Sequence, residues 1–196
     1  MVDNRSYFVH VLKEYKTSLW DFQKQKGNFS INCAAMIGSK MSLHLKRIHG
    51  MGFVHLDVKP DNMLIEDITE QTVFIDFGNA QYYLKEDNKT HRKQREELDV
   101  KGSRYFMSLN GLKFRTQSRK DDLISLLYSL FYLMDPEVFC GILRDPNNKK
   151  FDKISKFRVD KAKPFIPILE YIYGLEYDQE PDHDKISFMF KKVILE

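Results

Sequence analysis

The sequence lacks most features that mark secreted, metal-binding or membrane-spanning proteins. It has 2 cysteines, Cys33 and Cys140, and their separation fits neither a metal site nor a disulfide framework. The polar N-terminus, from Met1 to Arg5, has no apolar signal-peptide core. The longest nearly continuous apolar stretch, Leu123 to Met134, is too short to cross a bilayer. We therefore expect an intracellular protein of the cytoplasm, the nucleus or both, with no membrane partner.

An excess of charge of one sign is also missing. The 31 basic and 28 acidic side chains are interspersed and leave a net charge of +3, so nothing requires nucleic acid as a partner. Internal repeats and low-complexity linkers are absent, and a hydrophobic share of 42% is ordinary for a globular chain. These properties favour one domain with a substantial core.

The most specific pattern is a polar run followed by a short apolar stretch and an acidic turn. Residues 55–62, His-Leu-Asp-Val-Lys-Pro-Asp-Asn, read H-x-D-x-K-x-x-N, and residues 76–78 are Asp-Phe-Gly. Between them, residues 72–75 have the composition of a strand. Such a run resembles the catalytic loop and metal-binding loop of a protein kinase. A plain polar loop before a buried strand and an Asp-Gly turn is the simpler alternative.

Each polar residue in this pattern has a chemical role that phosphoryl transfer needs. Asp57 can accept the proton of a substrate hydroxyl, and Lys59 can reach the transferred phosphate. Asn62 and Asp76 can hold Mg²⁺ against the phosphates of ATP. We therefore take Asp57 and Lys59 as the candidate catalytic residues, and Asn62 and Asp76 as the candidate cofactor and metal ligands.

Local patterns predict rigid elements around these residues. Ser18 and Ser30 are predicted N-caps, and the apolar spacing after Ser30 predicts a helix over 31–49. Residues 63–65 and 73–75 are predicted to pair as a hairpin behind the loop. Helices are also expected over 123–134, around 164–173 and over 184–193, with a turn at 147–150 and a solvated loop over 82–101.

Two buried polar residues are given structural roles. Asp122 opens the apolar helix, where an aspartate can accept backbone N–H groups, and we expect it to brace the catalytic loop from below. A simple N-cap is the alternative, and the two roles are compatible. His55 is expected to pack under the loop rather than act as a ligand or base, since none of the 6 histidines has a neighbour at metal spacing.

Taken in order, the motifs resemble the large lobe of casein kinase I-type serine/threonine protein kinases, with the vaccinia-related kinases as further candidates. The resemblance is collinear from about Tyr7 to the C-terminus and is carried by residues 18–22, 55–62, 76–80, 119–123 and 171–184. It implies an α+β, predominantly helical fold of the protein-kinase-like large lobe. Residues 1–12 would be a residual small-lobe strand, 13–17 the hinge and 18–196 the large lobe.

The resemblance also implies an activity. It predicts a transferase that uses ATP and Mg²⁺ to phosphorylate serine or threonine of a protein substrate, with residues 82–101 as the activation segment. Leu56 replaces the arginine usual in this motif, which normally pairs with a phosphorylated activation loop. That replacement removes one switch but leaves the base in place.

The small lobe is the main departure from the family. Nothing before Tyr7 supplies a Gly-rich loop or the lysine and glutamate that clamp the phosphates, and none of the 9 glycines forms G-x-G-x-x-G. We therefore expect apolar surface where the small lobe would pack, and a possible partner that covers it. The alternative function is a catalytically silent pseudokinase or binding scaffold. A phosphotransferase outside the protein kinases is a third reading.

Overall fold

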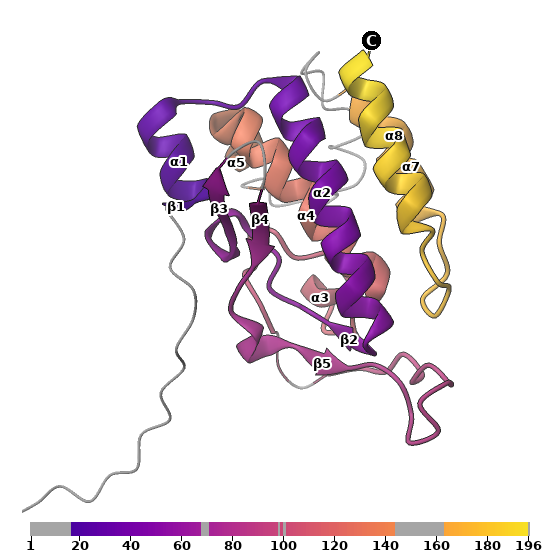
Figure 1. Ribbon diagram of the computed structural model, residues 1–196. Helices are drawn as coiled ribbons and strands as arrows, with labels where there is room; N and C mark the ends of the chain where they lie inside the picture. The colour runs from indigo at the N-terminus through magenta and orange to yellow at the C-terminus, as the bar shows by residue number, and fades with distance from the viewer. Residues whose placement is uncertain (1–16, 68–70, 98, 100, 144–162, 196) are drawn as a thin grey trace, which may run out of the picture.

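The computed structural model describes residues 17–67, 71–97, 99, 101–143 and 163–195. Its helices are α1 (Leu19–Lys26), α2 (Ile31–Gly50), α3 (Leu109–Leu112), α4 (Arg119–Met134), α5 (Pro136–Leu143), α7 (Ile166–Tyr173) and α8 (His183–Leu195). Single 3-10 turns lie at Pro60–Asn62, Phe77–Asn79 and Lys163–Phe165. The fold is α+β and predominantly helical, as predicted (Figure 1). The predicted small-lobe strand over 1–12 and the turn at 147–150 lie outside the described residues.

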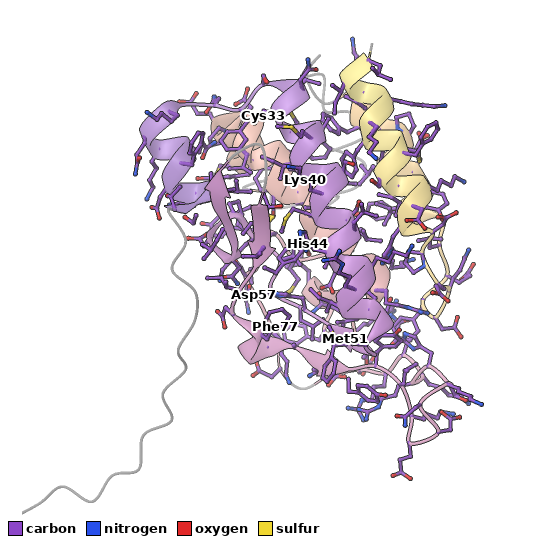
Figure 2. The ribbon with its side chains drawn as sticks, viewed as in Figure 1. Cys33, Lys40, His44, Met51, Asp57 and Phe77 are labelled. Carbon is purple, nitrogen blue, oxygen red and sulfur yellow. The ribbon has the colours of Figure 1, made fainter. Side chains whose placement is uncertain are left out.

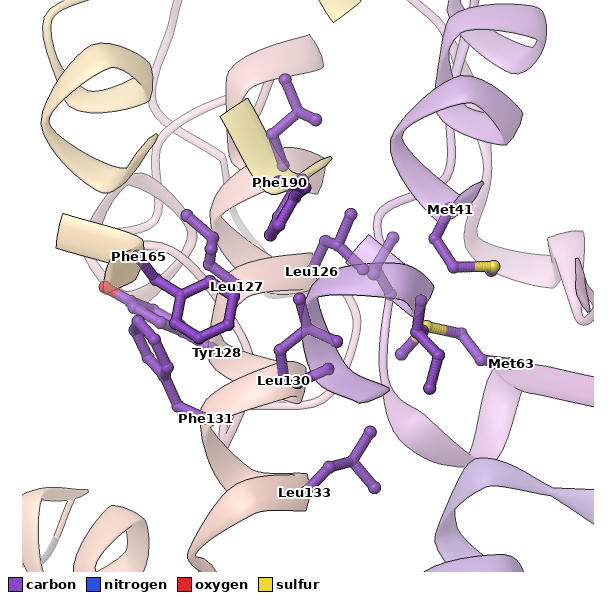
Figure 3. Packing of buried hydrophobic residues seen from close by; sticks show 14 of the residues in the cluster. Met41, Met63, Leu126, Leu127, Tyr128, Leu130, Phe131, Leu133, Phe165 and Phe190 are labelled. Atoms are coloured by element: carbon purple, nitrogen blue, oxygen red, sulfur yellow. The ribbon is translucent and has the colours of Figure 1, made fainter. Parts of the chain in front are cut away.

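The buried helix α4 is the centre of the core. Ser118 and Asp121 form a capping box at its start: the Ser118 amide donates to the Asp121 carboxylate over 2.7 Å. Beyond this cap the predicted apolar run is buried on nearly all sides. Figure 3 shows the rings of Tyr128, Phe131 and Phe165 gathered beside the helix. This explains why the run carries no polar face.

Helix α2 confirms the prediction from its N-cap and spacing. The Ser30 hydroxyl accepts a hydrogen bond from the Cys33 amide over 3.2 Å, and the helix continues to Gly50. Helix α8 lies along α2 (Figure 1). The contact is close because Gly38 presents no side chain, and a Cβ atom there would lie 2.5 Å from the ring of Phe190.

Two small antiparallel sheets complete the fold. Strands β3 (Met63–Asp67) and β4 (Gln71–Phe74) form the predicted hairpin, and β1 (Thr17–Ser18) pairs with β3 on its other side. Residues 13–16 of the predicted hinge lie outside the described residues. Its last residue, Thr17, lies in a strand opposite Ile65. The second sheet pairs β2 (Phe53–Val54) with β5 (Gln81–Tyr82). Among the described residues, no helix is both long and apolar enough for a membrane crossing.

The structure differs from the sequence-based expectation at some ends and in two short helices, α3 and α5, which were not predicted. Strand β4 stops at Phe74, one residue short of the predicted end, and α8 is longer than predicted at both ends. Helix α5 follows α4 directly. Its first residue, Pro136, is compatible with a helix start because the first turn needs no N–H donor there.

Candidate active site

Residues 55–62 form a loop between β2 and β3, and this loop brings three of the four predicted site residues together. The Asp57 carboxylate is 5% exposed. Its Oδ2 accepts hydrogen bonds from Lys59 Nζ at 2.7 Å and from Asn62 Nδ2 at 3.1 Å. Its Oδ1 accepts one from the Ser103 amide at 2.8 Å. Three donors from two segments therefore fix the orientation of one buried carboxylate.

Asn62 links the loop to the acidic turn. Its Nδ2 donates a second hydrogen bond, to the backbone carbonyl of Asp57 at 2.9 Å. The backbone carbonyl of Asn62 accepts a hydrogen bond from the Ile75 amide at 3.0 Å. Within the described part of the chain, Asn62 Oδ1 accepts no hydrogen bond. Because Nδ2 is turned toward Asp57, the amide oxygen is left for a ligand.

Asp76 follows Ile75 and lies at the surface. It adopts a left-handed backbone with φ of 61°, and its Oδ1 accepts a 3.3 Å hydrogen bond from the Gly78 amide. Among the hydrogen bonds of the described residues, Asp76 is joined to Asn62 only through the backbone of Ile75. Carboxylate and amide oxygens are suitable Mg²⁺ ligands, so Asp76 and Asn62 have the right donor chemistry. Among the described residues, no group of three His, Cys, Asp or Glu forms another metal site.

Asp122 braces the loop from below, as predicted. Its Oδ2 accepts the His55 amide at 2.7 Å and its Oδ1 accepts the Leu56 amide at 2.9 Å. Burial acts to raise the pKa of Asp122, but the hydrogen bond from His49 and the nearby histidines outweigh it and lower that pKa overall. The cap of α4 is instead Ser118, so the bracing role is the one the geometry supports.

His55 is structural, also as predicted. The ring is fully buried, and its Nε2 lies 3.1 Å from the Ile75 carbonyl. It also packs against the rings of Phe74 and Phe77, at centroid distances of 5.2 and 4.8 Å. His55 therefore holds the catalytic loop against the acidic turn.

Two further histidines, His49 and His183, extend the hydrogen bonds of Asp122, and the sequence did not predict them. His49 Nε2 lies 2.9 Å from Asp122 Oδ2, and His49 Nδ1 lies 2.9 Å from His183 Nε2. Since a carboxylate oxygen only accepts, His49 donates through Nε2. Burial lowers the pKa of His183 to about 4, so His183 is neutral near pH 7. Nothing local in the sequence marks His49 and His183 as partners.

A tight backbone contact places Ser103 at Asp57. Gly102 has φ of +91°, and a Cβ atom there would lie 2.0 Å from the Leu56 carbonyl oxygen. Only glycine fits a site that is both left-handed and this crowded. Gly102 thus allows the next amide, that of Ser103, to reach the Asp57 carboxylate, a contact that the motif alone did not predict.

Three large apolar side chains are exposed on β2, at the end of α2 and in the acidic turn. Met51, Phe53 and Phe77 are 63%, 42% and 49% exposed, and we call them the apolar patch. In Figure 2, Asp57 and Phe77 lie near each other below the hairpin, while Met51 lies at the lower end of α2.

Comparisons with known proteins show the family of the chain. Residues 1–190 match the protein kinase domain. Casein kinase I homolog 2 of Schizosaccharomyces pombe is 31% identical over 180 residues, which cover 85% of this chain and 41% of the relative. Casein kinase I homolog 3 of Saccharomyces cerevisiae is 29% identical over 188 residues, covering 80% and 36%. The chain thus spans less than half the length of these relatives, and the predicted resemblance to casein kinase I is confirmed.

Proposed function

We infer that this chain, which belongs to the protein kinase family and resembles its casein kinase I-type serine/threonine members, transfers the γ-phosphate of ATP to a hydroxyl of a protein substrate. The observation that carries this proposal is the buried Asp57 carboxylate, oriented by Lys59, Asn62 and the Ser103 amide. Cys33 and Cys140 are both free thiols, which supports a reducing compartment. We therefore propose that the protein acts inside the cell, in the cytoplasm or nucleus, where ATP is available.

The hydrogen bonds at Asp57 favour one of its two carboxylate oxygens as the acceptor of the substrate proton. A carboxylate oxygen has two acceptor positions. Oδ2 uses both, for Lys59 and Asn62, whereas Oδ1 uses one, for the Ser103 amide. Asp57 Oδ1 is therefore the proposed acceptor of the hydroxyl proton. Lys59 Nζ, with one contact to Asp57, keeps further N–H groups for the transferred phosphate.

Asn62 and Asp76 are the proposed ligands of Mg²⁺. The Asn62 Oδ1 atom and the surface carboxylate of Asp76 fit this hard cation in donor type. When bound, Mg²⁺ would neutralise charge on the ATP phosphates. The protein's own part is to keep both side chains oriented, through the Ile75–Asn62 backbone hydrogen bond and the Gly78 amide.

The apolar patch favours a second candidate function, a catalytically silent pseudokinase that acts as a binding scaffold. In this alternative a partner covers Met51, Phe53 and Phe77, and no phosphate is transferred. The two functions make opposite predictions for the purified full-length protein in the presence of Mg²⁺ and ATP.

Phosphotransfer to a mixed protein substrate tests the proposal. We expect Asp57→Asn to lower the rate by about 10²–10⁴, the usual contribution of a positioned acid–base group. Asp61→Asn is the matched control, because Asp61 lies in the same loop but is exposed and forms no hydrogen bond or ion pair with the described residues. We expect Asp61→Asn to retain the wild-type rate. Equal rates for the wild type and Asp57→Asn would contradict the proposed base, and absence of transfer by full-length protein would favour the scaffold.

A further inference from the structure

Tyr83 lies directly after β5, where the chain leaves the acidic turn and enters the charge-rich segment 84–97. Its ring is buried and forms a small apolar cluster with Val54 and Leu56, against which Leu84 also packs. Val54 precedes the catalytic loop and Leu56 lies within it. One aromatic ring therefore joins the segment to the loop that carries Asp57.

The polar atoms of Tyr83 extend this junction to two helices. Its hydroxyl donates to the His49 carbonyl at the end of α2 over 2.7 Å, and accepts from Arg119 at the start of α4 over 3.4 Å. The Arg119 guanidinium carbon also lies 4.8 Å from the centre of the ring. A further hydrogen bond of 2.9 Å runs from the Tyr83 amide to the Gly52 carbonyl.

The returning half of the segment is attached to the same residue. The Tyr83 carbonyl accepts a hydrogen bond from the Arg92 amide over 2.9 Å, and the His91 ring lies 5.0 Å from the Tyr83 ring. Between them, Leu84 and His91 form a bridge, and the Lys85 amide donates to the Thr90 carbonyl over 2.8 Å. Residues 81–92 therefore form a loop that leaves and returns at Tyr83, and contacts of Tyr83 hold both of its ends.

We propose that Tyr83 is a positioning residue that fastens residues 81–92 to the catalytic loop in the unmodified chain. The polar contacts of Tyr83 reach backbone atoms of α2, of Gly52 and of Arg92, and the side chain of Arg119. The loop side chain that meets the ring is Leu56, which carries no charge to pair with a phosphate. The ring and its hydroxyl therefore supply the attachment of this segment.

The junction leads to the candidate base in two steps. Leu56 packs against Tyr83, and its carbonyl is in close contact with Gly102. The next amide, from Ser103, donates to Asp57. Loss of the ring would free Leu56 and loosen the donor at Asp57 Oδ1. This inference deepens the proposed function and rests on it for its catalytic consequence, but the attachment itself is a structural statement.

Hydrogen exchange followed by mass spectrometry tests the attachment in the full chain after phosphatase treatment. We expect peptides that contain Tyr83, Lys85 and Arg92 to be protected in the wild type, because their amides are hydrogen-bonded. Tyr83→Phe keeps the ring and loses the hydroxyl, so exchange there should be about fivefold faster, as for one lost hydrogen bond. Tyr83→Ala should make it about a hundredfold faster, because the ring is buried.

Phe188→Ala is the matched control, since Phe188 is an exposed aromatic residue on α8. This variant should leave exchange over 81–92 unchanged, and peptides of α2 and α4 report any global loss of stability. The proposal is overturned if dephosphorylated wild type exchanges freely over 81–92, or if Tyr83→Ala changes exchange there no more than in α2 and α4.

The catalytic consequence is measured separately, by phosphotransfer from ATP. We expect Tyr83→Ala to lower kcat with little change in the KM for ATP, and Tyr83→Phe to restore most of kcat, because the ring is what holds Leu56. If residues 81–92 are protected from exchange but the protein transfers no phosphate, the attachment through Tyr83 is supported and the proposed kinase activity is rejected. An active protein with normal kcat in Tyr83→Ala would reject the positioning role alone.

Discussion

The neutral His183 makes the stability of this protein depend on pH in a window that can be calculated. His183 is the first residue of α8, is 4% exposed, and contacts His49 across the interface with α2. Burial is the main cause that lowers the pKa of His183 from 6.5 to about 4, and the charges of His49 and Lys46 add to it. Asp182 and Asp184 act in the opposite direction.

The sign and the size of the effect follow from proton binding. Between pH 6.5 and about 4 the unfolded chain carries a proton on His183 and the folded chain does not. Acid therefore favours unfolding, by about 1.4 kcal/mol for each pH unit. The contribution is fully present above pH 6.5, and about 3 kcal/mol of stability is lost by about pH 4.

Urea unfolding of the wild type and of His183→Gln at pH 7.5, 6.5 and 5.5 measures this contribution. Gln cannot titrate, and its side-chain amide can either donate a hydrogen bond to His49 Nδ1 or accept one from it. From pH 7.5 to 5.5 we expect the wild type to lose about 1.4 kcal/mol more than the variant, most of it below pH 6.5. Acid-sensitive groups elsewhere, including Asp122, act equally in both proteins. Parallel losses in the two proteins would refute a neutral, buried His183.

Three substitutions test other parts of the fold. Gly102→Ala places a Cβ atom against the Leu56 carbonyl at a positive φ, so we expect a loss of at least about 1 kcal/mol in thermal unfolding and reduced phosphotransfer. Gly38→Ala overpacks the contact with Phe190 and should cost about 1–3 kcal/mol in urea unfolding. Ser30→Ala removes the cap of α2 and should cost about 1 kcal/mol, whereas Ser30→Asp should not. Wild-type stability in any of the three alanine variants would contradict the contact concerned.

Features that depend on neighbouring residues were predictable from the sequence. The Ser30 cap acts on an amide three residues away, and the apolar spacing after it reports the buried face of α2. The buried helix α4 was predictable from the apolar composition of residues 123–134 alone. The role of Asp122 is a long-range feature that was nevertheless predicted, because a carboxylate at the start of a buried helix can accept backbone N–H groups. The amides of the catalytic loop are those donors.

Two other features that join distant residues were not predictable. His49 and His183 are 134 positions apart, and their contact depends on how α8 lies along α2. The Ser103 amide reaches Asp57 from 46 positions away, because Gly102 allows the close approach. A linear motif records the residue types of the site, but it omits backbone donors, which have no residue type to recognise.

The position of the candidate base is thus set by the hydrophobic core rather than by the loop alone. Helix α4 is fixed by burial on nearly all sides, and it carries Asp122 at its start. Asp122 holds the amides of His55 and Leu56, the two residues before Asp57. A buried carboxylate with several donors tolerates little displacement. The position of α4 therefore determines the position of Asp57, through the two hydrogen bonds that Asp122 accepts from the loop. The same fully buried apolar run therefore serves both the stability of the fold and the geometry of the site.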